Sequence, residues 1–263
     1  MIFSSSPSNW RDLQDKVSKI FKDIGFKTEV EKDVATARGV INIDVFAEDE
    51  SQSPKLIYLC ECKWWDKAVP KSVIHSFRTV VSDFGANYGL LISREGFQEG
   101  AYEAARFTNI NLLDWDQFQE LFEDKWFNNY MAPQVNEICS PLVAYTEPIN
   151  SRVLAEAGKL DSEKQIQFRA LRSKYQAIAF FALQIGIPIF LPELRGSKQL
   201  LKQAVSSGLF AKLGQTGLPD DLLEASAMID FFNILVEHCH TGIREFDNLF
   251  GKPITAISLK FLG

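Results

Sequence analysis

The sequence predicts an α/β fold followed by an all-α region, and two observations support this prediction. Strand and helix patterns alternate through the first half of the chain. From about residue 150 the patterns are helical over long stretches, with little strand signal. Strands and helices that alternate in this order form layers around a mixed sheet. We therefore expect an α/β domain over residues 1–130, a connector over residues 131–150 and a helical domain over residues 151–263.

Hydrophobic spacing defines the elements of the first domain. Apolar residues recur at helical intervals from Trp10 to Ile24, and Gly25 ends that helix. The segment VINIDVFA alternates apolar and polar residues, and the polar tract EDESQSPK turns the chain back into LIYLCECK, so these two strands are expected to be antiparallel neighbours. The expected elements are a helix over 10–24, strands over 26–30, 40–47 and 56–63, a helix over 70–84, a strand over 88–93, a helix over 96–107, a strand over 110–113 and a helix capped by Asp114 that reaches residue 122.

The second half of the chain has a different texture. MAPQVNEICSPLVAYTEPINS contains three prolines and no clear periodicity, which predicts an irregular connector. Helical patterns follow over residues 161–185, 197–209 and 220–246, the last being one helix or two. The segment YQAIAFFALQIG is apolar around much of its circumference, so we expect it to be buried in a helical bundle or against another chain.

Composition and charge exclude several classes of protein. The apolar content of 46% and charged content of 24% are typical of a soluble globular protein. The N-terminus lacks the pattern of a signal peptide, the longest apolar stretch (177–191) is too short to span a bilayer, and the four cysteines form no CxxC pair, so we expect a cytoplasmic protein without a membrane partner. Residues 1–130 hold 15 basic and 21 acidic residues, a balance of −6, and residues 131–263 hold 13 of each. A protein that binds nucleic acid through charge alone is basic, so any such role here requires local basic groups, a bound cation or several chains.

The motif ECK at the end of the strand 56–63 is the strongest chemical signal. Glu61 and Lys63 share one face of that strand, and Asp44 reaches the same face if the two strands pair as expected. Two close carboxylates form a hard-oxygen site for Mg²⁺ or Mn²⁺, which keep several waters and take other ligands from a substrate phosphate. Lys63 is then placed to orient or deprotonate a water, or to stabilise an oxyanion. The alternative is a plain ion cluster at a sheet end, in which Lys63 is paired to Glu61 or Asp44.

At these residues the sequence resembles the PD-(D/E)XK nuclease superfamily, and most closely its Mrr-like restriction endonuclease branch. The resemblance covers residues 8–125 and rests on WRDLQDKVSKIFKDIGF, RGVINIDVFA and YLCECKWW, with GANYGLLISREGFQEGAYEAARFTNINLLDWDQF following in the usual order. It implies a restriction-endonuclease-like mixed sheet flanked by helices. It also implies that Asp44, Glu61 and Lys63 catalyse the hydrolysis of DNA phosphodiester bonds, with Asp44 and Glu61 as the metal ligands.

One position departs from the family's pattern. Many members carry a glutamate on the first helix where this chain has Gln14, whose neutral amide can still hold a metal-bound water. We therefore treat Gln14 and Asn42 as supporting residues. Trp64 and Trp65 are expected either to stack on bases or to pack within the protein. Four further side chains either contact DNA phosphates or form a plain solvated face: Arg38, Lys67, Lys71 and Arg78.

Two functions follow from this pattern. The first is a Mg²⁺-dependent DNA endonuclease, and the resemblance sets it in restriction or anti-phage defence. The second is a catalytically weak or inactive nuclease-fold protein that binds nucleic acid or a partner. The helical domain is expected to form a homo-oligomer such as a dimer, to recognise the target, to dock a regulatory protein partner, or only to stabilise the chain.

Overall fold

A five-stranded mixed sheet with the strand order β1-β2-β3-β4-β5 organises the first part of the chain. β1, β2 and β3 are antiparallel neighbours, whereas β3, β4 and β5 run parallel. The strands are β1 (Lys27–Thr36), β2 (Gly39–Asp49), β3 (Leu56–Lys63), β4 (Tyr88–Ser93) and β5 (Ile110–Leu113). The expected antiparallel pairing is confirmed, because Val45 of β2 lies opposite Cys60 of β3.

The computed structural model describes residues 1–186 and 218–255. The chain divides into two units, Met1–Tyr130 and Met131–Gly263. The first unit contains the sheet and the described part of the second is helical, which confirms the predicted fold class.

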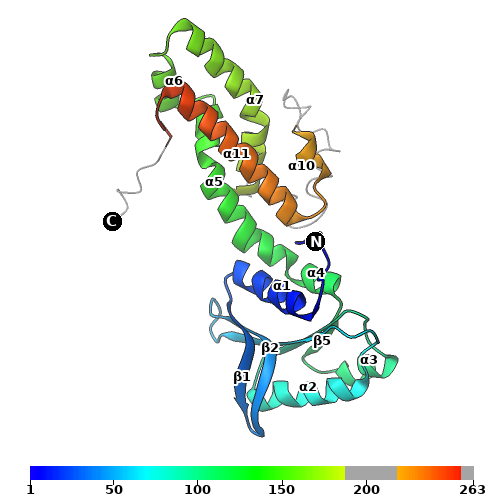
Figure 1. Cartoon of the computed structure of the whole chain (residues 1–263). Helices are drawn as coiled ribbons and strands as arrows, with labels where there is room; N and C mark the ends of the chain where they lie inside the picture. Colours follow the sequence, from blue (N-terminus) through cyan, green and yellow to red (C-terminus); the bar gives the residue numbers. More distant parts are fainter. Residues whose placement is uncertain (187–217, 256–263) are drawn as a thin grey trace. The chain divides into compact units, whose positions relative to one another are not determined.

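Helices cover both faces of the sheet (Figure 1). They are α1 (Trp10–Asp23) and α4 (Trp115–Trp126) on one face, and α2 (Lys71–Phe84) and α3 (Glu99–Ala105) on the other. Neighbouring residues of β3 contribute to both cores: the Tyr58 ring lies 5.8 Å from that of Phe21 in α1, whereas Leu59 belongs to the cluster that contains Ile74 of α2. Complete burial of a side chain such as Leu59 contributes about 1.5–3 kcal/mol, so these two cores hold β3 firmly in the centre of the unit.

Local chemistry fixes the ends of α1 and α4. The side chain of Asn9 accepts a hydrogen bond from the backbone N–H of Asp12 at 2.9 Å, which satisfies a free donor in the first turn of α1. Gly25 follows the helix with a φ of 91°, a conformation that glycine adopts without strain. Asp114 accepts from the N–H of Gln117 at 2.8 Å and caps α4, as its position in the sequence predicted.

Two elements differ in length from the prediction. β1 continues to Thr36, well beyond the predicted strand over 26–30, because it is a solvent-exposed edge strand whose polar residues hide the strand pattern. α3 spans Glu99–Ala105 rather than residues 96–107. Its start is delayed because Gly96 has a φ of 71° and Gln98 has an extended backbone.

The second unit consists of helices over its described residues. They are α5 (Ala132–Thr146), α6 (Ser151–Ala157), α7 (Ser162–Gly186), α10 (Asp220–Glu224) and α11 (Met228–Phe250). The pattern over 220–246 thus forms two helices, and the helix predicted over 197–209 lies outside the described residues. Among the helices of the two described ranges, none combines the length and the apolar character needed to cross a membrane.

The irregular connector predicted for residues 131–150 is wrong, because α5 occupies most of this segment. Pro133 lies in the first turn of α5, directly after a π-helical turn over Phe127–Met131. Pro141 lies inside α5, at a cost of about 3 kcal/mol in an isolated helix. The burial of Leu142 and Tyr145 offsets this cost, so tertiary packing overrides the proline signal.

The apolar segment of α7 is covered within its own unit. The ring of Phe181 is 1% exposed and lies 5.6 Å from the ring of Phe231 in α11. Ile178 and Ala182 are buried as well. The described part of the apolar stretch 177–191 is therefore already packed inside the chain, and residues 187–191 lie outside the described residues.

Candidate active site

Asp44 lies at the end of the β2–β3 ladder, held by donors from two other elements. The last ladder pair is Val45 with Cys60, so continuation of the register brings Asp44 opposite Glu61. One carboxylate oxygen of Asp44 accepts from the side-chain amide of Gln14 at 2.9 Å, and the other accepts from the backbone N–H of Cys62 at 2.6 Å. These two hydrogen bonds fix the orientation of the carboxylate between α1 and β3.

Glu61 and Lys63 follow on β3, where they share a face as the alternation of a strand requires. Lys63 donates from Nζ to a carboxylate oxygen of Glu61 in a close ion pair. Both side chains are mostly shielded from solvent, with exposed fractions of 18% for Lys63 and 22% for Glu61. The structure therefore brings Asp44, Glu61, Lys63 and Gln14 together at one end of the central hairpin.

The electrostatics of this group are unbalanced. Burial raises the pKa of Glu61, and the negative charge of Asp44 raises it further, while the Lys63 ammonium lowers it. The net pKa of Glu61 lies above its ordinary value, so burial and the second carboxylate outweigh the ion pair. A positive charge placed between the two acids would relieve this repulsion.

The donor set fits a hydrated divalent cation rather than a site built wholly from protein ligands. Among the described residues, no cluster of three or more His, Cys, Asp or Glu side chains is arranged to hold a metal ion. The residues that would hold such a cation are Asp44 and Glu61, whose two carboxylates match the number of protein ligands typical of Mg²⁺ sites that keep waters and bind substrate phosphate. The cysteines of β3 offer no soft alternative, because burial and the nearby acids raise the pKa of the Cys60 and Cys62 thiols.

The other predicted residues lie in separate surroundings. Asn42 uses both hydrogens of its amide on β1, donating to the backbone carbonyl of Glu31 at 3.0 Å and to the carboxylate of Asp33 at 2.9 Å. Arg38 is exposed in the β1–β2 turn and pairs with Asp83 of α2 at 2.9 Å. The remaining candidates for phosphate contacts are all exposed. Lys67 follows β3, and Lys71 and Arg78 lie on α2.

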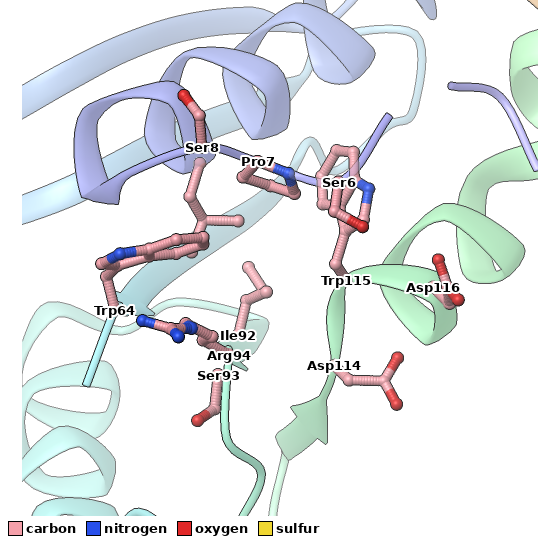
Figure 2. A pocket seen from close by; sticks show the side chains of 11 residues that line it. Ser6, Pro7, Ser8, Trp64, Ile92, Ser93, Arg94, Asp114, Trp115 and Asp116 are labelled. Atoms are coloured by element: carbon pink, nitrogen blue, oxygen red, sulfur yellow. The ribbon is translucent and has the colours of Figure 1, made fainter. Parts of the chain in front are cut away.

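The sequence prediction missed a pocket of about 520 Å³ beside this group. Figure 2 shows Trp64 on one side of the pocket and Trp115, Asp114 and Asp116 on the other, with Ile92, Ser93 and Arg94 between them. Its position follows from the parallel strands, since the ends of β3, β4 and β5 meet at one edge of the sheet. The available signal was the charged Arg94 directly after the buried strand YGLLIS.

The mixed sheet, its two helical layers and the acidic pair beside a lysine define an α/β domain of the restriction-endonuclease-like class. Residues 7–122 match the family model Mrr_cat, described as a restriction endonuclease. This match agrees with the resemblance to the Mrr-like restriction endonuclease branch that the sequence predicted.

Two further comparisons concern the whole chain. Among curated proteins, none matches it. It is similar to the solved crystal structure of a protein of unknown function, AF1548, with 16% sequence identity and a TM-score of 0.36 over 79% of this chain and 100% of the other.

Proposed function

We propose that the protein is a divalent-cation-dependent endonuclease that hydrolyses DNA phosphodiester bonds, with Mg²⁺ or Mn²⁺ as its cation. The match of residues 7–122 to a restriction endonuclease family model supports nuclease activity. The observation that carries the metal dependence is the register that brings Asp44 opposite Glu61 at one strand end, where burial and the charge of Asp44 raise the pKa of Glu61. Two acids that repel each other at one strand end are stabilised by a bound cation.

In this proposal each residue has a distinct task. Asp44 and Glu61 hold the cation, and Gln14 and the N–H of Cys62 keep the Asp44 carboxylate in one orientation. The cation, when bound, supplies positive charge against the reacting phosphate and acidifies water. Lys63 donates from Nζ toward the reacting phosphate or the attacking water, and Glu61 holds that ammonium in place.

The proposed biological setting is the restriction of foreign DNA, including anti-phage defence. It rests on the family of residues 7–122. A binding protein that keeps the fold without cutting is the competing outcome. Its motivation is the neutral Gln14 amide on Asp44, where many relatives have a glutamate.

A cleavage assay separates these two outcomes. The full-length protein is incubated with supercoiled and linear DNA, with Mg²⁺, with Mn²⁺ and with EDTA, and the products are resolved on a gel. The proposal predicts nicks or breaks only in the samples with a cation. DNA that is bound but uncut in all three conditions would replace the enzyme with the binding module.

We also propose that the helical unit brings a second chain or a regulatory protein to the nuclease unit. The charge balance of −6 in residues 1–130 motivates this, because a second chain would add phosphate contacts. The described part of the apolar stretch 177–191 is buried within the chain, so a homodimer would use another surface. Sedimentation of the full-length protein at micromolar concentration tests this: a dimer supports pairing of two chains, and a monomer that cuts no DNA alone favours a regulatory partner.

A further inference from the structure

Two residues that line the pocket, Trp64 and Arg94, are linked to Lys63 of the candidate active site through the backbone. Arg94 donates its backbone N–H to the carbonyl of Lys63 at 3.0 Å, which extends the pairing of β3 with β4 by one residue. Trp64 follows Lys63 directly and lines the pocket, as Arg94 does. The pocket therefore lies at the same end of β3 as the residues proposed to cut the phosphodiester bond, and Trp64 in its lining is one residue along the chain from Lys63.

The lining of the pocket has the chemistry that recognises a nucleobase. Trp64 offers an indole face, and the guanidinium of Arg94 lies 4.9 Å from the centre of that ring. Ser6 and Ser8 contribute exposed hydroxyl groups, and Asp114 contributes a carboxylate. Flat aromatic surface stacks on a base, while hydroxyl and carboxylate oxygens accept hydrogen bonds from its N–H groups. The volume of about 520 Å³ lies within the range of pockets that bind small organic groups.

Further exposed indoles lie close to the candidate active site. Trp10 is 46% exposed and lies one turn before Gln14 on α1, so the two side chains share a helix face. The guanidinium of Arg11 lies 4.8 Å from the Trp10 ring. Trp65 is 36% exposed, and the ammonium of Lys63 lies 5.6 Å from its ring. Exposed aromatic rings with adjacent cations are typical of surfaces that bind single-stranded nucleic acid.

The charge of the unit points to the same class of substrate. Duplex binding depends strongly on neutralised phosphates, and residues 1–130 carry six more acidic than basic residues. Stacking on indoles requires bases that are free of their partners, and it contributes about 1–3 kcal/mol per base in addition to the phosphate contacts.

We propose that the pocket between Trp64 and Trp115 accepts one unpaired base of the substrate, so that the protein acts on single-stranded or locally unpaired DNA. This inference rests on the proposed nuclease function and names the substrate class of that site. The base stacks on Trp64, the neighbouring nucleotides lie along Trp65 and Trp10, and the phosphate next to the bound base lies at Lys63.

Equilibrium binding in EDTA tests the pocket without any cleavage. The probe is a fluorescently labelled twelve-nucleotide DNA, used as a single strand and annealed to its complement, with full-length wild-type protein. We expect at least about tenfold tighter binding of the single strand. Trp64→Leu, which keeps apolar bulk but cannot stack, is expected to weaken single-strand binding about 5- to 150-fold, the loss that one base–aromatic stack represents.

Two variants separate stacking from damage to the fold. Trp64→Phe keeps an aromatic face and is expected to retain most of the single-strand affinity, whereas Ser6→Phe, which fills the pocket from its other wall, is expected to lose it. Phe107→Ala removes an aromatic side chain that is 93% exposed and does not line the pocket, and it is expected to bind as the wild type does. Thermal unfolding of each variant shows whether it is folded.

The outcomes are distinct from those of the cleavage assay. Equal affinity for the single strand and the duplex, or unchanged affinity in both Trp64→Leu and Ser6→Phe, overturns the pocket even if the protein cuts DNA. A single-strand preference that both variants abolish supports the pocket even if the protein cuts nothing.

Discussion

The β2–β3 hairpin carries a pair of acidic residues at each end, and the two pairs differ in how their charge is balanced. At the turn end, Asp49 is 1% exposed and accepts from Lys125 at 3.0 Å and from the hydroxyl of Ser51 at 2.5 Å. Its neighbour Glu48 is paired with Lys55. At the other end, Lys63 is paired with Glu61, and among the described residues no Lys or Arg lies within ion-pair distance of Asp44.

The pKa values follow this difference. Burial raises the pKa of Asp49, but the hydrogen bonds from Ser51 and Lys125 outweigh it, so the net pKa lies below the ordinary value. The pKa of Glu61 lies above its ordinary value, because burial and the charge of Asp44 outweigh Lys63. At the turn end each acid is paired with a lysine, and these pairs stabilise the fold. At the Asp44–Glu61 end two acids share one lysine, and a bound cation can supply a further positive charge.

The largest expected effect is on catalysis. Lys63→Ala and Asp44→Ala are each expected to reduce DNA cleavage by at least about 100-fold, because each removes a group that acts on the reacting phosphate or holds the cation. Asp49→Asn is the matched control, since it changes an acid of the same hairpin. Initial rates of plasmid nicking, compared among folded variants, measure this. Loss of cleavage in Asp49→Asn alone would reverse the assignment of the two ends.

The next effect concerns stabilisation by a cation. Mn²⁺ at about 100 times its dissociation constant is expected to stabilise the wild type by about 2.7 kcal/mol, because it binds the native site and not the unfolded chain. Asp44→Asn, which lacks one of the two acids, is expected to respond much less. Melting temperatures with and without Mn²⁺ report this difference, and identical shifts in the two proteins would place the cation elsewhere.

A comparable effect on stability is expected at the turn end. Asp49→Asn is expected to destabilise the protein by about 1–3 kcal/mol, because the buried side chain at this position loses the charge that accepts hydrogen bonds from Ser51 and Lys125. Its response to Mn²⁺ remains that of the wild type. Urea unfolding at neutral pH measures the loss, and a stability equal to that of the wild type would mean that these contacts contribute little.

The smallest effect is the dependence of stability on pH in EDTA. Because the native pKa of Asp49 is lowered, its stabilising contribution is present above the unfolded pKa and is lost as the pH falls through the native value. The raised pKa of Glu61 has the opposite sign: its contribution is present at low pH and is lost as the pH rises through the native value. Glu61→Gln is therefore expected to equal the wild type near pH 4 and to gain on it toward pH 7. A constant difference over this range would contradict the raised pKa.

Much of the fold was predictable because its signals are local. Apolar spacing identified α1, and alternation with a polar turn identified the pairing of β2 with β3. The grouping of Asp44, Glu61 and Lys63 followed from that pairing, and Gln14 was identified through the resemblance of the first helix to that of the family.

Other features depend on tertiary contacts that cannot be predicted from local sequence patterns. The pocket forms where β3, β4 and β5 end together, and the strand order was not readable from periodicity. α5 is helical in spite of Pro141, because packing of its apolar face outweighs local propensity. Asn42 was expected to support the site, but its amide is engaged by Glu31 and Asp33 of the edge strand.

Calorimetric titration with Mn²⁺ tests the central claim most directly, since it measures the binding of a cation to the protein without DNA or catalysis. Four proteins are compared: the wild type, Asp44→Asn, Glu61→Gln and Asp49→Asn. The account predicts that the wild type and Asp49→Asn bind Mn²⁺ with the same stoichiometry and affinity, and that Asp44→Asn and Glu61→Gln lose this binding. Equal binding by all four proteins would show that the Asp44–Glu61 end of the hairpin is not a cation site.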